Sequence, residues 1–265
     1  MIIVSSSDNA YAQHLGVMII SLLKNKARTT MISIYILDGG ISEQNRIKLL
    51  SISKKYSFMM AFIKIDPHEY KYVKISDYIS QASYYRILIP NFIPHEVNKI
   101  LYLDCDIIVK KDLSDMWNTD ISNYYLAAVE NQYPTDYKSL GLLKSDDYFN
   151  AGVMLVNIES WRNMNVTRQC FEFLKKYPEA IRFWDQDVLN AVIKGLWYHL
   201  PSTYNFESSR ITFKHSKPNQ KTPHIIHFFD KHHRPWLFIT TGNKMEYWRY
   251  LWRSPWRFYI PPDFT

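Results

Sequence analysis

Glycine and cysteine are both scarce in this chain of 265 residues, which has 7 glycines and 2 cysteines. So few glycines exclude a collagen-like or low-complexity chain, and two cysteines provide no disulfide framework. No uninterrupted apolar run reaches the roughly 18 residues that a membrane-spanning helix needs. No basic segment precedes the apolar start Met1–Ser5, so it predicts a first strand and not a signal peptide. We therefore expect a cytoplasmic protein in a reducing compartment.

Aromatic residues make up 16 % of the chain, and its formal net charge is +7. The aromatic content predicts a packed globule, and the positive charge favours anionic partners. Lys and Arg are spread along most of the chain, so we expect no nucleic-acid partner. They alternate with Trp and Tyr only in the segment 247–259. This segment predicts either contact with an anionic membrane, peripheral to its inner face, or an aromatic cap folded on the core.

The hydrophobic pattern alternates between strands and helices from the start. Strands are predicted over Ile2–Ser5, Met31–Leu37 and Phe58–Ile65, with helices over Ala12–Lys24 and Ser42–Tyr56 between them. This order predicts an α/β fold with a single Rossmann-like, mostly parallel twisted sheet flanked by helices. The glycine-rich fingerprint G-x-G-x-x-G is missing after the first strand, so a dinucleotide cofactor is not supported.

The rest of the chain continues the α/β pattern without an internal repeat or a clear linker. We expect one catalytic domain over residues 1–240 and a short aromatic and basic extension over 241–265. The further predicted helices are Ser80–Leu88, which is stopped before Pro90, Ile158–Tyr177 and one that begins at Trp184. The further predicted strands are Asn98–Val109, Tyr125–Val129, Trp197–Leu200, Ile225–Phe229 and one within Tyr148–Val156, where a turn of polar and small residues leads into the strand.

Two carboxylates interrupt the buried strand predicted over Asn98–Val109. Asp104 and Asp106 share one side if the strand is still extended there, with Cys105 opposite. Two carboxylates at the end of a buried strand repel each other and are costly to bury. A divalent cation removes both costs, and carboxylate oxygens suit Mg²⁺ or Mn²⁺. An Asp-x-Asp alone more often marks a surface turn or a cap, so the rest of the chain decides.

Six separated segments together carry a resemblance to a known family. They are Ser6–Tyr11, Ser83–Arg86, Leu101–Asp106, Phe149–Val153, Trp184–Asn190 and the stretch from His227 to Trp236. In this order they resemble the family 8 glycosyltransferases, typified by bacterial lipooligosaccharide galactosyltransferases and glycogenin. The resemblance implies a GT-A fold and a retaining hexosyltransferase that moves galactose or glucose from a UDP-sugar to a hydroxyl of a glycan or glycolipid, as in lipopolysaccharide biosynthesis.

The resemblance also implies roles for individual residues. Asp104, Asp106 and His227 would hold Mn²⁺, or Mg²⁺, against the donor diphosphate. Asp185 and Gln186 would face the sugar hydroxyls and the anomeric carbon, and Glu130 would lie near the acceptor. The remaining donor-binding residues would be Ser6, Asp8, Asn9, Tyr11, Arg86, Cys105, Asn150, Ala151, Gly152 and Arg234.

The resemblance leaves two points open, one about the diphosphate contact and one about the function. The interval after His227 is one residue longer than is usual in the family, so Lys231 or His233 could replace Arg234 at the diphosphate. The alternative functions are a non-catalytic nucleotide-sugar-binding protein and a self-glucosylating primer like glycogenin. A nucleotidyltransferase is disfavoured, because the chain has no glycine-rich phosphate loop near its N-terminus.

Overall fold

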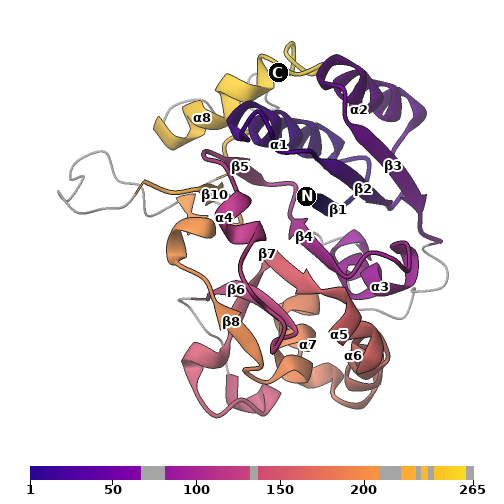
Figure 1. Ribbon diagram of the computed structural model, residues 1–265, viewed down its shortest axis with the longest axis vertical. Helices are drawn as coiled ribbons and strands as arrows, with labels where there is room; N and C mark the ends of the chain where they lie inside the picture. Colours follow the sequence, from indigo (N-terminus) through magenta and orange to yellow (C-terminus); the bar gives the residue numbers. More distant parts are fainter. Residues whose placement is uncertain (67–80, 132–136, 209–221, 231–233, 238–241, 261–265) are drawn as a thin grey trace.

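The computed structural model describes residues 1–66, 81–131, 137–208, 222–230, 234–237 and 242–260. Within these ranges, seven strands form one twisted sheet in the order β3-β2-β1-β4-β7-β6-β8 (Figure 1). Strand β7 is antiparallel to its neighbours β4 and β6, and the other neighbours are parallel. The predicted mostly parallel sheet is confirmed. Its strands are β1 (Ile2–Ser7), β2 (Ser33–Asp38), β3 (Met59–Lys64), β4 (Lys99–Leu103), β6 (Leu126–Glu130), β7 (Phe149–Asn157) and β8 (Trp197–His199).

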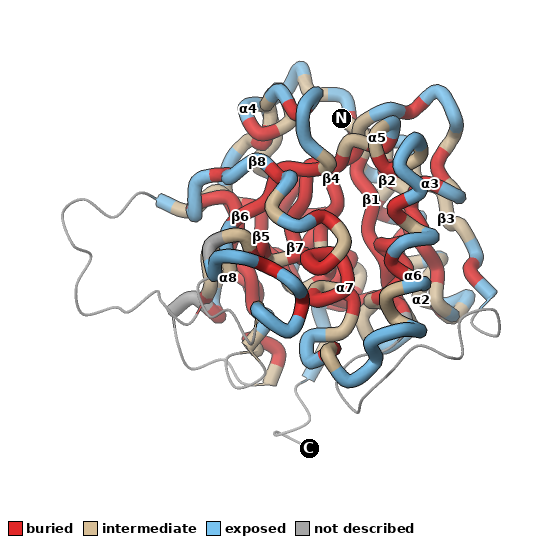
Figure 2. The backbone as a smooth tube through the Cα atoms, turned by 90° about the horizontal axis from the view of Figure 1, so that it is seen from below, coloured by how far each residue is buried: buried red, intermediate tan, exposed pale blue. Residues whose placement is uncertain are grey.

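Helices cover both faces of this sheet (Figure 1). Helices α1 (Ala12–Asn25), α2 (Glu43–Tyr56) and α8 (Gly242–Leu251) share one hydrophobic cluster, and α3 (Ile89–Phe92), α5 (Ile158–Asn163), α6 (Val166–Lys176) and α7 (Trp184–Ile193) share another. Alternate residues of β4 divide between the clusters, because strand side chains alternate faces. Leu101 and Leu103 pack with α1, whereas Ile100 and Tyr102 pack with α7. The central strands β1, β4, β6 and β7 are accordingly buried (Figure 2), whereas the edge strands β3 and β8 are partly exposed.

Several predicted helix boundaries are confirmed and others are wrong. The helix predicted over Ser42–Tyr56 begins one residue later, because Ser42 is its N-cap and accepts a hydrogen bond from the Asn45 amide. The helix predicted over Ile158–Tyr177 is divided into α5 and α6 at Asn165, which has a φ of 51°. The segment Gln81–Leu88 (η2) is a 3₁₀ helix, and Ser80 lies outside the described residues. Pro90 does not end a helix but lies in the first turn of α3, where its missing amide hydrogen costs nothing.

The predicted continuous strand Asn98–Val109 is wrong, because the chain changes sheets at the two carboxylates. Strand β4 ends at Leu103, a turn follows at Cys105–Asp106, and β5 (Ile107–Val109) begins a second sheet. In the described residues that sheet has the order β5-β10-β9, with β10 (Ile225–His227) antiparallel to β5 and β9 (Phe206–Glu207) parallel to β10. His227 pairs with Ile107 in this sheet, so it lies beside the turn that carries the carboxylates.

The small-residue segment Asn150–Gly152 lies inside β7 and not in a turn before it. Ala128 of β6 pairs with Met154, but the next residue, Val129, pairs with Asn150. The register shift forms a β-bulge, and bulges redirect side chains and backbone next to active sites. The bulge places Gly152 opposite the turn between β4 and β5, and its carbonyl accepts a hydrogen bond from the Asp104 amide at 2.8 Å.

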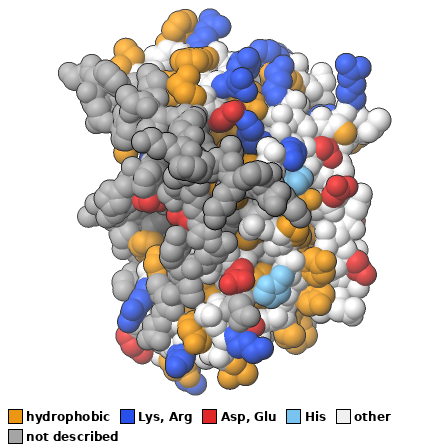
Figure 3. All heavy atoms as spheres, turned by 90° about the vertical axis from the view of Figure 1, so that its left-hand side faces the viewer, with side chains coloured by type: hydrophobic (Ala, Val, Ile, Leu, Met, Phe, Trp, Pro, Cys, Tyr) orange, Lys and Arg blue, Asp and Glu red, His pale blue; other side chains and the backbone are white. Residues whose placement is uncertain are grey.

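The C-terminal extension packs as an aromatic cap on α1. Tyr247, Trp248 and Leu251 of α8 are buried in the same cluster as α1. Further along, the ring of Trp256 lies against Gly16, where a Cβ atom would approach it to 2.4 Å. Trp252 and Phe258, in contrast, are exposed. Figure 3 shows Lys and Arg side chains at the end of the molecule that carries α1, α2 and α8 and also at the opposite end. No helix among the described residues is long and apolar enough to cross a bilayer.

Candidate functional site

A cavity of about 330 Å³ lies at the carboxyl ends of β1 and β4, where ligands bind in open α/β sheets. Its walls come from both sheets and from the start of α7. The site residues predicted from the sequence that line it are Ser6, Asp8, Tyr11, Arg86, Asp104, Cys105, Asp106, Asn150, Gly152, Asp185, Gln186, His227 and Arg234.

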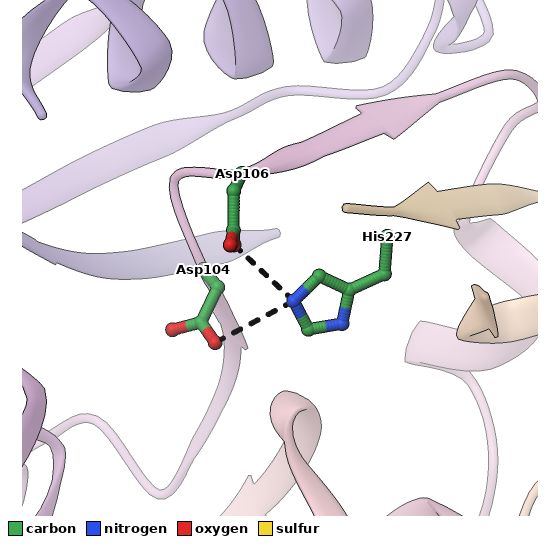
Figure 4. Close-up of side chains that lie close together, drawn as sticks. All are labelled: Asp104, Asp106 and His227. Atoms are coloured by element: carbon green, nitrogen blue, oxygen red, sulfur yellow. Dashed lines mark hydrogen bonds and ion pairs between the residues drawn. The ribbon is translucent and has the colours of Figure 1, made fainter. Parts of the chain in front are cut away.

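Asp104, Asp106 and His227 converge in this cavity (Figure 4). Each offers one ligand atom, and the three atoms lie within 4.8 Å of one another. The Nε2 atom of His227 is 3.2 Å from Oδ1 of Asp106 and 3.8 Å from Oδ2 of Asp104. Two carboxylate oxygens and one imidazole nitrogen form a donor set that suits Mn²⁺ or another divalent first-row cation. The three residues therefore fit the metal that the sequence predicts.

Hydrogen bonds behind His227 determine which of its ring nitrogens faces the carboxylates. The Gly152 amide donates to Oδ1 of Asn150 at 3.0 Å, and Nδ2 of Asn205 donates to the same oxygen at 2.7 Å. Oδ1 of Asn205 therefore faces Nδ1 of His227, at 2.8 Å, and Nδ1 must carry the hydrogen. Nε2 then faces Oδ1 of Asp106 at 3.2 Å, a contact that requires a proton or a cation between the two atoms.

Gly152 makes room for this cluster. A Cβ atom there would lie 2.2 Å from Cε1 of His227 and 2.7 Å from Oδ2 of Asp104, closer than any real Cβ contact. Only glycine allows the bulged strand β7 to approach the two residues this closely.

The two carboxylates differ in their electrostatic environments. Burial raises the pKa of Asp104, and the neighbouring Asp106 charge adds to this shift against the opposing effect of Arg86. Burial also acts to raise the pKa of Asp106, but His227 and Arg234 outweigh it and hold that pKa below its usual value. A cation bound between the two groups would stabilise the ionised form of both.

Arg86 joins the carboxylates to the rest of the cavity. Its guanidinium lies 3.0 Å from Oδ1 of Asp104 and 2.8 Å from Oδ2 of Asp185, and it donates to the Ala151 carbonyl at 2.6 Å. The group also lies over the Tyr102 ring, 4.7 Å from its centroid. Burial raises the pKa of Asp185 to about 7, against the attraction of Arg86 and with the Asp104 charge adding to the increase. Arg86 thus compensates the partly buried Asp104 and the buried Asp185, and its own pKa is raised despite burial, because these two acids outweigh the desolvation.

The start of α7 holds Gln186 in one orientation. Its Oε1 accepts from the Ala151 amide at 3.0 Å, and its Nε2 donates to the Tyr148 hydroxyl at 2.9 Å. The hydroxyl in turn donates to Oδ1 of Asp187 at 2.6 Å. Because a backbone amide can only donate, the Gln186 amide cannot be flipped. Trp184, just before the site residues, has a φ of 46°, a strained conformation of the kind found at functional sites.

The loop after β1 forms another wall of the cavity. Oδ1 of Asp8 accepts a hydrogen bond from the Tyr11 amide at 3.0 Å, which fixes the turn into α1. The Ser6 hydroxyl is hydrogen-bonded to the Tyr102 hydroxyl at 2.8 Å, and Tyr102 donates to Oδ1 of Asp104 at 3.0 Å. This chain of contacts links the loop to the acidic cluster.

Comparison with known proteins agrees with this geometry. The family model described as "Glycosyl transferase family 8" matches residues 2–240. The chain belongs to glycosyl transferase family 8.

Several relatives in this family cover nearly the whole chain. General stress protein A of Bacillus subtilis (strain 168) is 33 % identical over 97 % of this chain and 94 % of its own length. Lipopolysaccharide 1,2-glucosyltransferase of Escherichia coli (strain K12) is 23 % identical over 97 % of this chain and 79 % of its own length. The crystal structure of the galactosyltransferase LgtC, in complex with donor and acceptor sugar analogs, is 26 % identical with a TM-score of 0.84, covering 100 % of this chain and 99 % of that chain. The fold is thus of the GT-A type, and this family 8 member is a glycosyltransferase enzyme of the class that uses a UDP-sugar donor and a divalent metal.

Three residues predicted for the family 8 site lie away from its cavity walls. Asn9 binds the Ser42 amide and the Asn45 side chain through Oδ1, so it ties the first loop to α2. Ala151 contributes its backbone groups to Arg86 and Gln186 and no side chain. Glu130 is exposed at the end of β6, and its neighbour Asn131 lines the cavity instead. Lys231 and His233, the alternatives to Arg234, lie outside the described residues.

Other residues of this family 8 site were not predicted. Phe183, Trp184 and Phe229 line the cavity, and Tyr102, Tyr148 and Asn205 orient residues that line it. Tyr102, Trp184 and Phe229 lie inside the six segments that carry the family resemblance, and Tyr148 and Phe183 each adjoin one of them, so these segments are the signal that could have identified them. Asn205 has no such signal, because its contact with His227 joins residues 22 positions apart through the second sheet.

Proposed function

We propose that this protein is a metal-dependent, retaining hexosyltransferase that moves galactose or glucose from a UDP-sugar to a hydroxyl of a glycan or glycolipid. The observation that carries the proposal is the convergence of Asp104, Asp106 and Nε2 of His227 on one point of the cavity. The site stands at the switch between two sheets, with Arg86 and Arg234 on its walls to meet a diphosphate.

Asp104, Asp106 and His227 would hold Mn²⁺, or Mg²⁺, in this site. A cation bound there supplies Lewis-acid stabilisation of the charge that develops on the departing UDP. Two residues outside the ligand set would hold the ligands in orientation: Asn205 is hydrogen-bonded to His227, and Tyr102 donates to Asp104.

Side chains on the other walls would bind the two halves of the donor. Asp8 would accept a hydrogen bond from the uracil, and the ring of Tyr11 would stack on it. Ser6 and the Cys105 backbone would lie near the ribose. Arg86 and Arg234 present planar cationic donors that match phosphate oxygens. Asn150 and Gly152 would lie beneath the hexose, and Asp185 would accept from its hydroxyls.

The reaction we propose takes place on one face of the sugar. The bond between the anomeric carbon and UDP breaks, the acceptor oxygen bonds to the same face of that carbon, and the departing phosphate takes the acceptor's proton. Gln186 supports the oxocarbenium-like carbon with its amide oxygen, and it is not a covalent nucleophile. An amide held by Ala151 and Tyr148 keeps this oxygen in place without reorganisation. Glu130 would contact the acceptor from the rim.

We further propose that the acceptor is glycan or lipid-linked material presented at an anionic membrane. Trp252 and Phe258 are 50 % and 82 % exposed, and Arg253 and Arg257 beside them are exposed as well. Exposed aromatic and basic side chains on one short segment favour contact with anionic headgroups.

The first experiment measures UDP release from UDP-, GDP- and ADP-sugars, with Mn²⁺ and with EDTA, in the absence of an acceptor. We expect slow release from UDP-glucose or UDP-galactose that requires Mn²⁺. Asp104→Asn and Asp106→Asn should reduce it by orders of magnitude, whereas Asp115→Asn, an exposed acid on the nearby α4 (Ser114–Trp117), should leave it unchanged.

Three outcomes would contradict parts of the proposal. Full release with EDTA or in Asp106→Asn would exclude the metal site. Mn²⁺-dependent binding of UDP by calorimetry without release, even with glycan acceptors, would indicate a non-catalytic binding protein. A hexose mass on a tyrosine of the purified protein would indicate a self-glucosylating primer.

A further inference from the structure

The C-terminal helix α8 contacts the helix that follows the nucleotide loop through one buried hydroxyl. Tyr247 of α8 is 1 % exposed, and its hydroxyl lies 2.6 Å from Nδ1 of His14 and 3.2 Å from Nε2 of Gln13. Both partners belong to the first turn of α1, directly after Tyr11. More than 230 residues separate the contact partners along the chain.

The directions of these hydrogen bonds follow from the groups involved. Gln13 donates its amide hydrogen to the Tyr247 oxygen, so the hydroxyl hydrogen is available to Nδ1 of His14. Burial lowers the pKa of His14 to about 3, so its ring is neutral and Nδ1 can accept. Tyr247 therefore fixes the rotamer of His14.

The ring of His14 supports two walls of the cavity. It stacks on Trp236 with 3.8 Å between centroids, and Tyr11 meets it edge-on at 5.3 Å. The Arg234 guanidinium in turn lies over the ring of Trp236, 5.7 Å from the ring centroid. Tyr11 and Arg234 both line the cavity, whereas His14 and Tyr247 do not.

We propose that Tyr247 is a positioning residue for donor binding, which acts through His14 on Tyr11 and on the Trp236–Arg234 pair. The inference rests on the proposed function, because Tyr11 and Arg234 are the residues assigned there to uracil and diphosphate. It gives the C-terminal helix a role in the nucleotide site that is separate from any membrane contact of the exposed residues after it.

The test compares Tyr247→Phe with Tyr250→Phe. The two tyrosines are both buried and lie on the same helix, and the Tyr250 hydroxyl accepts from Nδ2 of Asn25 at 2.7 Å, at the far end of α1 from the cavity. Tyr247→Phe loses the hydrogen bonds to Gln13 and His14, and Tyr250→Phe loses the one to Asn25, so both variants should lose thermal stability, Tyr247→Phe more. We expect Tyr247→Phe alone to weaken Mn²⁺-dependent UDP binding, by about tenfold, and to raise the donor KM with little change in kcat.

A double-mutant cycle tests whether Tyr247 acts through His14. His14→Phe keeps a ring on Trp236 but removes the acceptor, so Tyr247→Phe should cost little further UDP affinity in that background. Equal UDP affinities of Tyr247→Phe and Tyr250→Phe would overturn the inference, and so would full additivity with His14→Phe. Wild-type protein that binds no UDP would instead contradict the proposed function. If Tyr247→Phe does not fold, the UDP affinities of His14→Phe and Tyr250→Phe are compared instead. Weaker UDP binding by His14→Phe supports the inference, and equal affinities overturn it.

Discussion

Nδ1 of His227 donates a hydrogen bond to Oδ1 of Asn205 at 2.8 Å, and this contact leaves Nε2 to face the two carboxylates. The orientation of Asn205 is itself fixed, because its Nδ2 donates to Asn150. Neither asparagine is among the proposed metal ligands, but together they determine the orientation of the His227 ring.

The first prediction concerns this contact. Asn205→Ala should weaken Mn²⁺ binding about 10- to 100-fold, because the ring of His227 loses its orientation and basicity. Calorimetric titration of Mn²⁺ in the presence of UDP measures the change. Asn118→Ala removes an exposed asparagine and serves as the control. Unchanged affinity in Asn205→Ala would show that packing alone orients His227.

The second prediction concerns Gly152. Gly152→Ala should abolish Mn²⁺-dependent UDP binding, because the new methyl group displaces His227 or Asp104. Gly141→Ala is the matched control: its φ of 76° makes alanine strained there, but nothing lies within 4 Å of the added Cβ. Gly141→Ala should lower the free energy of unfolding by about 1 kcal/mol, and with it the melting temperature, and should leave UDP binding intact. Retention of binding in Gly152→Ala would contradict the close approach of β7.

The third prediction separates sugar positioning from donor binding. Tyr148→Phe removes the hydroxyl that holds Nε2 of Gln186, so kcat should fall about tenfold or more while the donor KM changes little. Tyr84→Phe is the control, because among the described residues the buried Tyr84 hydroxyl has no hydrogen-bond partner. A parallel rise in KM, or equal kinetics of the two variants, would disprove a role in orienting Gln186.

The fourth prediction follows from the pKa of Asp185, which burial raises to about 7 from a usual value of 3.8. A carboxyl with a raised pKa in the folded state contributes most stability below the unfolded pKa, and this contribution is lost as the pH rises toward 7. In the metal-free protein, Asp185→Asn should therefore gain stability relative to wild type between pH 4 and pH 7, by up to roughly 4 kcal/mol.

Chemical denaturation at several pH values, with EDTA, measures this difference. Asp115→Asn, at an exposed position, should show no such trend. Mn²⁺ should reduce the effect, because a cation on Asp104 offsets the charge that helps to raise the pKa of Asp185. A stability difference that is independent of pH would show that Asp185 stays ionised, paired with Arg86.

The fifth prediction concerns the membrane. Replacing Trp252 and Phe258 by serine should reduce sedimentation with anionic liposomes and leave UDP release intact, because both side chains are exposed. Leu143→Ser, at a side chain that is 90 % exposed elsewhere, is the control. Equal sedimentation of all variants would exclude these side chains from membrane contact. Deleting the whole segment 247–259 is a poorer test, because it removes the buried Tyr247, Trp248 and Leu251.

The sequence by itself determined the α/β alternation, the sheet and the type of site. Hydrophobic periodicity depends on local geometry, so strands such as β1 and helices such as α2 could be predicted within one or two residues. Asp104, Asp106 and Gln186 lie in short motifs, and short motifs can be recognised without knowledge of distant contacts.

Only the tertiary structure decided how these residues act together. A periodicity argument treats Asn98–Val109 as one strand, but pairing of β5 with β10, 116 or more residues later, draws the chain into a second sheet and brings His227 to the carboxylates. The same holds for Asn205 behind His227 and for Tyr247 behind His14, because their partners lie far away in the sequence. Such contacts depend on packing and register between distant segments, and no local pattern in one sequence encodes them.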